Sequence, residues 1–190
     1  MTTYQLTHEG YVIKDGDTKV PTAKVPDIEV HPETLAYEAW LEAGGVPLPA
    51  ELPPIAERRA AVWERIKAER DRRAAMGVKV GAHWFHSDQK SRTQQLGLVL
   101  LGQSIPAGLQ WKTLTFTPPP VFVTMTPALA VGIVQSTAAS DTAIFTVAEV
   151  HRMTMEASAA PQDYDFSTGW PVSIEEEAHD AGIQFDGNAA

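Results

Sequence analysis

The chain contains no cysteine among its 190 residues. This absence excludes disulfides, thiolate nucleophiles, Cys-based zinc sites and iron–sulfur clusters. Basic residues are scarce, with 15 Lys and Arg against 24 Asp and Glu, and the net charge of −9 argues against a nucleic-acid binder. No run approaches the roughly 18 apolar residues that a membrane-spanning helix needs, so we expect no membrane insertion. The first ten residues lack the basic start and apolar stretch of a signal peptide, so we expect no secretory export.

The basic residues that do occur are concentrated in the first half of the chain. Residues 1–100 hold 13 basic and 14 acidic side chains, whereas residues 101–190 hold 2 and 10. Most of this excess lies near the end, where acidic side chains occur with no Lys or Arg. We therefore predict that residues 173–190 form an acidic tail, either solvated or ordered by a partner.

The first part of the chain is predicted to be a small module over residues 1–45. Apolar and β-branched residues flank Asp15-Gly16, a strong turn signal, which indicates a β-hairpin. The segment HPETLAYEAWLEAGG then predicts a short helix with Leu35, Trp40 and Leu41 on one face. Four prolines fall between residues 46 and 55, so residues 46–54 are predicted to be a semi-rigid spacer and the main domain boundary.

A linking helix over residues 55–76 is the clearest helical prediction. It has proline before its first turn, strong helix formers throughout and Gly77 as its stop. Too few of its heptad positions are apolar for a coiled coil.

Residues 77–172 are predicted to form a compact C-terminal domain of antiparallel strands packed on two helices. VKVGAHWFHS alternates like one strand, and Ser87 or Asp88 can cap a helix over about 88–103. Two further strands, 111–116 and 121–125, precede Thr126-Pro127, which starts a long helix to about residue 157 that Ser140-Asp141 could break in two. Without a βαβ repeat, the fold class is α+β.

Five tryptophans suit packing and interfaces. We interpret Trp84, Trp111 and Trp170 as core residues of the C-terminal domain. Trp40 and Trp63 lie in segments that are too short to bury a tryptophan alone. The interface candidates are therefore Trp40, Leu41, Ile55, Val62, Trp63 and Ile66.

Three histidines are the best candidates for residues of a chemical site. His83 and His86 could bind a metal only with a distant third ligand such as Asp88 or His151, because residues i and i+3 of a strand point to opposite faces. His151 is best interpreted as a single satisfied helix histidine, although an oligomer axis or pairing with Glu149 or Asp163 are alternatives. No nucleophilic serine motif and no phosphate loop is present. We predict no catalytic, cofactor or metal site.

A family resemblance rests on six ordered blocks within residues 65–172. These are RIKAERDRRA, VKVGAHWFHSDQKSRTQQL, QWKT, VTMTPALA, AEVHRMTMEAS and YDFSTGWP. Together they resemble a domain of unknown function common in tailed phages and prophages, usually encoded among tail-fibre genes. The start of the chain also looks like the N-terminal modules of phage tail accessory proteins. Two features of this chain depart from the family pattern, namely the Thr-Pro-Pro-Pro loop between the two strands and the acidic end.

The resemblance implies a setting and no activity. We expect a structural component of a phage tail, in the baseplate or tail-fibre region, which docks other tail proteins and resides in the virion after synthesis in the host cytoplasm. Because tail proteins of this kind are commonly trimers, the resemblance also implies that the chain forms a homo-oligomer, for which a trimer is one candidate. The alternatives are a tail-fibre assembly chaperone absent from the mature virion and, less favoured, a metal-dependent surface-glycan enzyme using His83 and His86.

Overall fold

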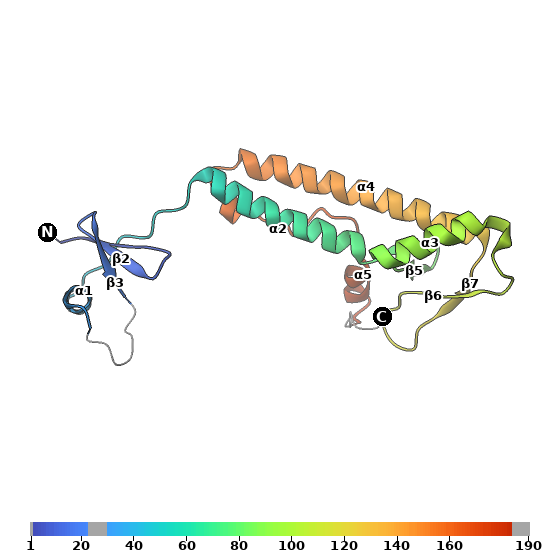
Figure 1. Cartoon of the computed structure of the whole chain (residues 1–190), viewed down its shortest axis with the longest axis horizontal. Helices are drawn as coiled ribbons and strands as arrows, with labels where there is room; N and C mark the ends of the chain where they lie inside the picture. Colours follow the sequence, from blue (N-terminus) through green and yellow to red (C-terminus); the bar gives the residue numbers. More distant parts are fainter. Residues whose placement is uncertain (1, 23–29, 184–190) are drawn as a thin grey trace. The chain divides into compact units, whose positions relative to one another are not determined.

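The computed structural model describes residues 2–22 and 30–183. Its contacts divide the chain into two compact units, Met1–Pro54 and Ile55–Ala190, and each is described here by itself (Figure 1). The predicted α+β class with antiparallel strands is confirmed, since every named sheet is antiparallel and five α-helices accompany them in the described residues.

The N-terminal unit is a three-stranded meander covered by one helix. Strands β1 (Tyr4–Leu6), β2 (Tyr11–Lys14) and β3 (Thr18–Pro21) pair in that order, so the predicted hairpin has a third strand. The Asp15-Gly16 turn has positive φ at both residues, as its sequence predicts. Helix α1 (Pro32–Glu42) closes the core, which contains Tyr4, Val12, Val20 and Tyr37.

Two details of this unit differ from the prediction. The face of α1 that turns inward carries Thr34 and Tyr37, while Leu35 and Leu41 are 52% and 38% exposed. The predicted spacer over residues 46–54 also makes a contact with the sheet. Leu48 pairs with β1 through two backbone hydrogen bonds of 2.8 and 2.9 Å, so the segment adds a short bridge to the sheet.

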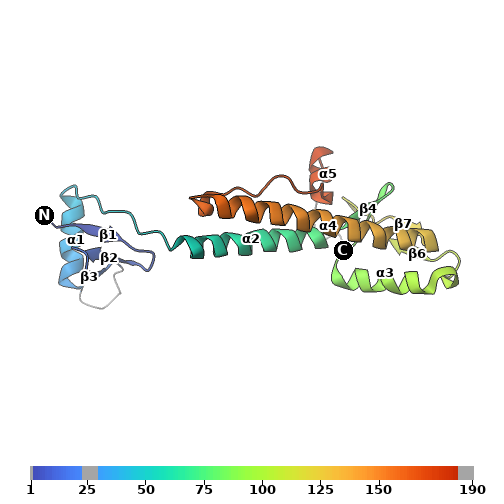
Figure 2. The same ribbon diagram turned by 90° about the horizontal axis from the view of Figure 1, so that it is seen from above.

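The helical unit is built on two long antiparallel helices, α2 (Ile55–Ala75) and α4 (Pro127–Ala157), which lie side by side in both views (Figures 1 and 2). Helix α3 (Gln89–Leu101) packs beside the first half of α4. One core forms where α2 and α4 meet, and it contains Val62, Ile66, Ile144, Ala148, Met155 and Trp170. A second core lies under α3 and contains Val78, Phe85, Leu98, Met125, Ala130 and Ile133.

Helix α4 begins where the sequence predicts. The Thr126 hydroxyl accepts a hydrogen bond from the Leu129 amide at 3.1 Å, and Pro127 occupies the first turn. The predicted break at Ser140-Asp141 is wrong, because the Asp141 carboxylate accepts hydrogen bonds from the Arg92 guanidinium instead of capping a new helix. The sequence led us to expect no helix that could span a membrane. By length and composition alone, however, α4 is long and apolar enough to cross one.

The segment after α2 is a hairpin and not the predicted single strand. Strands β4 (Val78–Val80) and β5 (His83–Phe85) pair antiparallel, and Gly81 turns the chain with a φ of 60°.

Asp88 caps α3, with its carboxylate accepting from the amides of Lys90 and Ser91. Strands β6 (Gln110–Lys112) and β7 (Phe122–Thr124) are shorter than predicted and flank the proline-rich loop. Short 3₁₀ turns follow α3 at Gly102–Ser104 and α4 at Pro161–Asp163.

Gly77 sits at the crowded junction between α2 and this hairpin. Its φ is +116°, and a Cβ there would lie 2.8 Å from Leu114 Cδ2 and 3.0 Å from the Phe85 carbonyl oxygen. We expect Gly77→Ala to lower the free energy of unfolding by about 1–3 kcal/mol, measured by urea denaturation. Gly97→Ala is the control, because a Cβ at this α3 position meets nothing within 4 Å. Equal stabilities for the two variants would contradict this description of the junction.

Candidate functional site

The sequence-predicted interface residues belong to two different units and differ in burial. Val62 and Ile66 are 3% and 0% exposed in the core between α2 and α4, so the interface interpretation is wrong for these two. Their face of α2 meets α4 of the same chain, a contact that the spacing within α2 cannot reveal. Ile55 is 38% exposed at the start of α2. Trp63 is half-buried, and Lys67 and Arg152 lie over its ring at 5.9 and 5.8 Å from the centroid.

Trp40 and Leu41 lie in the N-terminal unit. The Trp40 ring packs on Tyr4 and Tyr37, with centroid separations of 4.9 and 6.2 Å, and remains half-buried. Beside it is a groove of about 430 Å³, which is lined by Thr2, Thr3, Tyr4, Trp40, Ala43, Gly44, Gly45, Val46 and Leu48. Val46 is 83% exposed at its rim. Trp40 lines this groove, which we call the Trp40 groove, and the neighbouring Leu41 is exposed but does not line it.

The histidines do not form a metal site in the described part of the chain, where no group of three His, Asp or Glu side chains could hold an ion. His83 is half-buried on β5, and burial lowers the pKa of His86. His151 is 8% exposed, with Nδ1 2.8 Å from the Tyr164 hydroxyl and Nε2 3.0 Å from the Thr168 carbonyl oxygen. The interpretation of His151 as a satisfied helix histidine is confirmed.

A cavity of about 350 Å³ lies between β5 and the proline-rich loop. Threonine, proline and aromatic side chains form most of it, together with His83, Trp84 and Glu177. Trp84 is buried, as predicted, and its indole N–H has no hydrogen-bond partner among the described residues. The Lys79 ammonium, 2.6 Å from Glu177, holds the pKa of that carboxyl below its usual range. Glu177, which lines the cavity, is therefore already paired with a cation.

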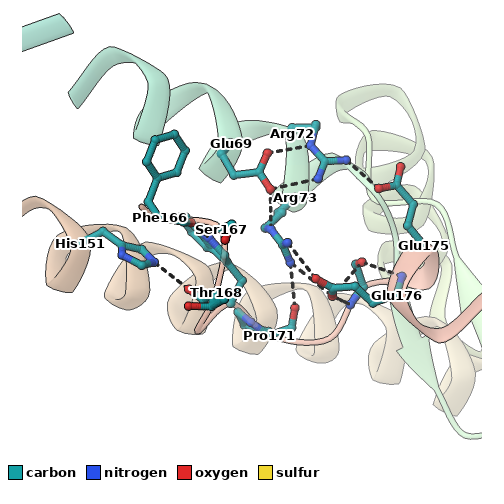
Figure 3. Close-up of polar contacts among 12 residues, drawn as sticks. Glu69, Arg72, Arg73, His151, Phe166, Ser167, Thr168, Pro171, Glu175 and Glu176 are labelled. Carbon is teal, nitrogen blue, oxygen red and sulfur yellow. Dashed lines mark hydrogen bonds and ion pairs between the residues drawn. The ribbon is translucent and has the colours of Figure 1, made fainter. Parts of the chain in front are cut away.

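The most extensive polar network surrounds Arg73 at the end of α2 (Figure 3). Arg73 is 8% exposed, and its guanidinium donates to Glu69 at 2.7 Å, Glu176 at 2.8 Å and the Pro171 carbonyl at 3.3 Å. It also lies over the Trp170 ring, 5.4 Å from the centroid. Burial acts to lower the pKa of Arg73, but the hydrogen bonds to the two carboxylates outweigh it and raise the pKa. A buried cation is stable only with such partners.

The prediction of a solvated acidic tail is wrong for the described part of that segment. Residues Ile174–Asp180 form helix α5, in which Ile174 and Ala178 are fully buried. Ser173 caps the helix and forms a capping box with Glu176. Three of the acidic residues that suggested solvation pair with cations of other elements: Glu175 with Arg72, Glu176 with Arg73 and Glu177 with Lys79. Asp180, in contrast, has an 86% exposed side chain. Residues 184–190, with Asp186, lie outside the described residues.

The comparison with known families identifies the helical unit. A profile described as "Domain of unknown function (DUF4376)" matches residues 57–168. The chain belongs to this family. The match runs from the first turn of α2 to the His151 partner Thr168 and stops before the Glu176 side of the Arg73 network. No curated protein and no solved structure matches the chain significantly.

The Arg73 network predicts that the charge on Glu176 stabilises the helical unit. Glu176→Gln keeps a side chain that can complete the capping box but removes one of the two carboxylates that pair with the buried Arg73 guanidinium. We expect a loss of roughly 1–2 kcal/mol in the free energy of unfolding at pH 7, measured by urea denaturation. The matched control Glu175→Gln removes an exposed pair and should change it by less than about 0.5 kcal/mol. Equal effects would contradict a special role for Arg73.

The same pair predicts an acid-sensitive part of the stability. The Arg73 guanidinium lowers the pKa of Glu176 from 4.5 to about 2. Because the folded pKa lies below the unfolded one, this contribution is present above pH 4.5 and is lost as the pH falls toward 2. A series of denaturation curves should show a smaller loss over this range in Glu176→Gln than in the unaltered chain. Parallel losses in the two proteins would exclude Glu176 as a contributor.

Proposed function

We propose that this chain is a structural component of a phage tail, in the baseplate or tail-fibre region, where it docks or connects other tail proteins. The setting comes from the six-block resemblance within residues 65–172. The family description names no activity, so no catalytic role is carried over. Under this proposal the chain resides in the virion, and its partners are tail proteins.

The observation that carries the proposal is the division into two units with separate cores. Tyr4, Val12, Val20 and Tyr37 form a core in the N-terminal unit, and the helical unit has two of its own. Pro49, Pro53 and Pro54 lie at the end of the N-terminal unit, just before α2, where proline restricts the backbone to extended conformations. Such a chain can bind one partner through each unit.

The Trp40 groove supports a docking role for the N-terminal unit. It joins aromatic side chains to exposed aliphatic ones, with Leu48 at 54% exposure beside Val46. Aromatic residues in a shallow apolar depression are typical of protein–protein contacts. The same groove would also suit transient contact with an unassembled fibre, so the assembly chaperone is the second candidate. It differs in one respect, because a chaperone leaves the particle.

Incorporation into the particle tests the proposal. We expect quantitative mass spectrometry of purified virions to find this chain in stoichiometric amounts. Val46→Asp should reduce the incorporated amount by roughly tenfold or more, because it places a charge at the rim of the groove. Leu35→Asp is the control, since Leu35 is exposed on α1 but does not line the groove. A chain needed for fibre assembly but missing from virions would instead favour the chaperone.

A further inference from the structure

The outward side of α4 carries a stripe with little charge. Its members recur at intervals of three or four residues and so lie on one side of the helix. They are Val131, Gln135, Ala138, Thr142, Phe145, Thr146, Glu149 and Met153, and all are exposed; we call them the outer stripe. The buried residues of α4, such as Ile133, Ile144 and Met155, lie on another side.

The outer stripe is more apolar than its residue names suggest. The hydroxyls of Thr142 and Thr146 donate to the carbonyls of Ala138 and Thr142, at 2.9 and 2.8 Å, which satisfies their polar groups within the helix. Phe145, Met153 and Val131 are 47%, 58% and 39% exposed. A groove of about 610 Å³ runs beside Phe145 and reaches Glu149, Val150 and Met153.

The charges of α4 are placed away from this stripe or paired. Between Pro127 and Ala148 the single charged residue is Asp141, which is paired with Arg92 of α3. Only 22% of the most apolar 18-residue stretch of α4 is buried in the chain. A helix that is apolar on nearly all sides is normally covered on all sides. The described residues cover only one.

We propose that the outer stripe packs against the outer stripe of a second copy of this chain, antiparallel, about a two-fold axis at Thr142. In such a pair, residues at equal distances on either side of Thr142 come level with each other. Val131 then meets Met153 of the partner subunit, and Gln135 meets Glu149 of the partner subunit. Apolar residues face apolar ones, and the Gln135 amide can donate to a carboxylate.

Size complementarity supports the same register. Within the stripe, the small Ala138 comes level with the partner's Thr146. Small residues thus stand beside the groove that Phe145 borders, and they allow close approach of the two helices. Ala128, which is exposed, continues the series of small residues toward the start of α4.

A parallel arrangement would be less favourable. It would place the Glu149 carboxylate beside the partner's Glu149 carboxylate. In the antiparallel pair the two Glu149 carboxylates are separated by about 21 Å along the helix, given a rise of about 1.5 Å per residue. The polar rim also fits. Arg70 lies over the Phe145 ring at 4.6 Å from its centroid, and Arg152 pairs with Glu149 at 2.7 Å.

The absence of natural cysteine makes a direct test of the register possible. Val131→Cys and Met153→Cys are prepared separately in the full chain, mixed and oxidised. We expect a disulfide-linked dimer in the mixture and roughly tenfold less in either variant alone, because like positions would lie about 33 Å apart. Thr142→Cys alone should cross-link at the axis. Cross-linking of Val131→Cys alone, or none in the mixture, would overturn the antiparallel pair.

A second measurement does not depend on cysteine chemistry. Sedimentation equilibrium of the full chain should give a dimer, and Thr142→Glu should raise the dimer dissociation constant by roughly tenfold or more, because it places two like charges at the axis. Ala143→Glu is the matched control, as Ala143 is exposed next to Thr142 but lies outside the stripe. A trimer, or a monomer that floats with phosphatidylcholine and phosphatidylglycerol vesicles, would contradict the proposal.

Discussion

The burial of the Arg73 guanidinium is the constraint on which the helical unit depends. A guanidinium that is 8% exposed must be neutralised, and the two carboxylates that do so come from opposite directions in the sequence. Glu69 lies one turn earlier in α2, and Glu176 lies in α5. The contact therefore joins the last described helix to the first helix of the unit, across about a hundred residues of chain.

Several other features follow from that closure. Trp170 lies under Arg73 and completes the core between α2 and α4, and its indole N–H donates to the Phe166 carbonyl at 2.7 Å. The same segment supplies Thr168 to His151. With its inner side fixed in this way, α4 presents the opposite side to solvent. The outer stripe is thus a consequence of how the helical unit closes.

The sequence predicts most of the helices because their signals are local. Thr126-Pro127, Asp88 and Gly77 mark helix ends through short-range hydrogen bonds and backbone geometry. The errors arise where a distant partner decides the outcome. Val62 and Ile66 are buried by α4, and Glu176 is ordered by Arg73, neither of which a local pattern contains. The hairpin of β4 and β5 is a different kind of error, because its signal is local. Gly81 between two short runs indicates a turn, but the alternating pattern continues across it and suggested a single strand.

Hydrogen exchange of the full chain, followed residue by residue, tests the claim that Arg73 makes α5 part of one cooperative helical unit. The account predicts that amides of Glu177 and Ala178 exchange with the same protection as those in the second half of α2, and that Arg73→Met lowers both together. Amides in β2 of the N-terminal unit should be unaffected by that substitution. Exchange of the α5 amides at the rate of an unstructured peptide, with α2 fully protected, would contradict it.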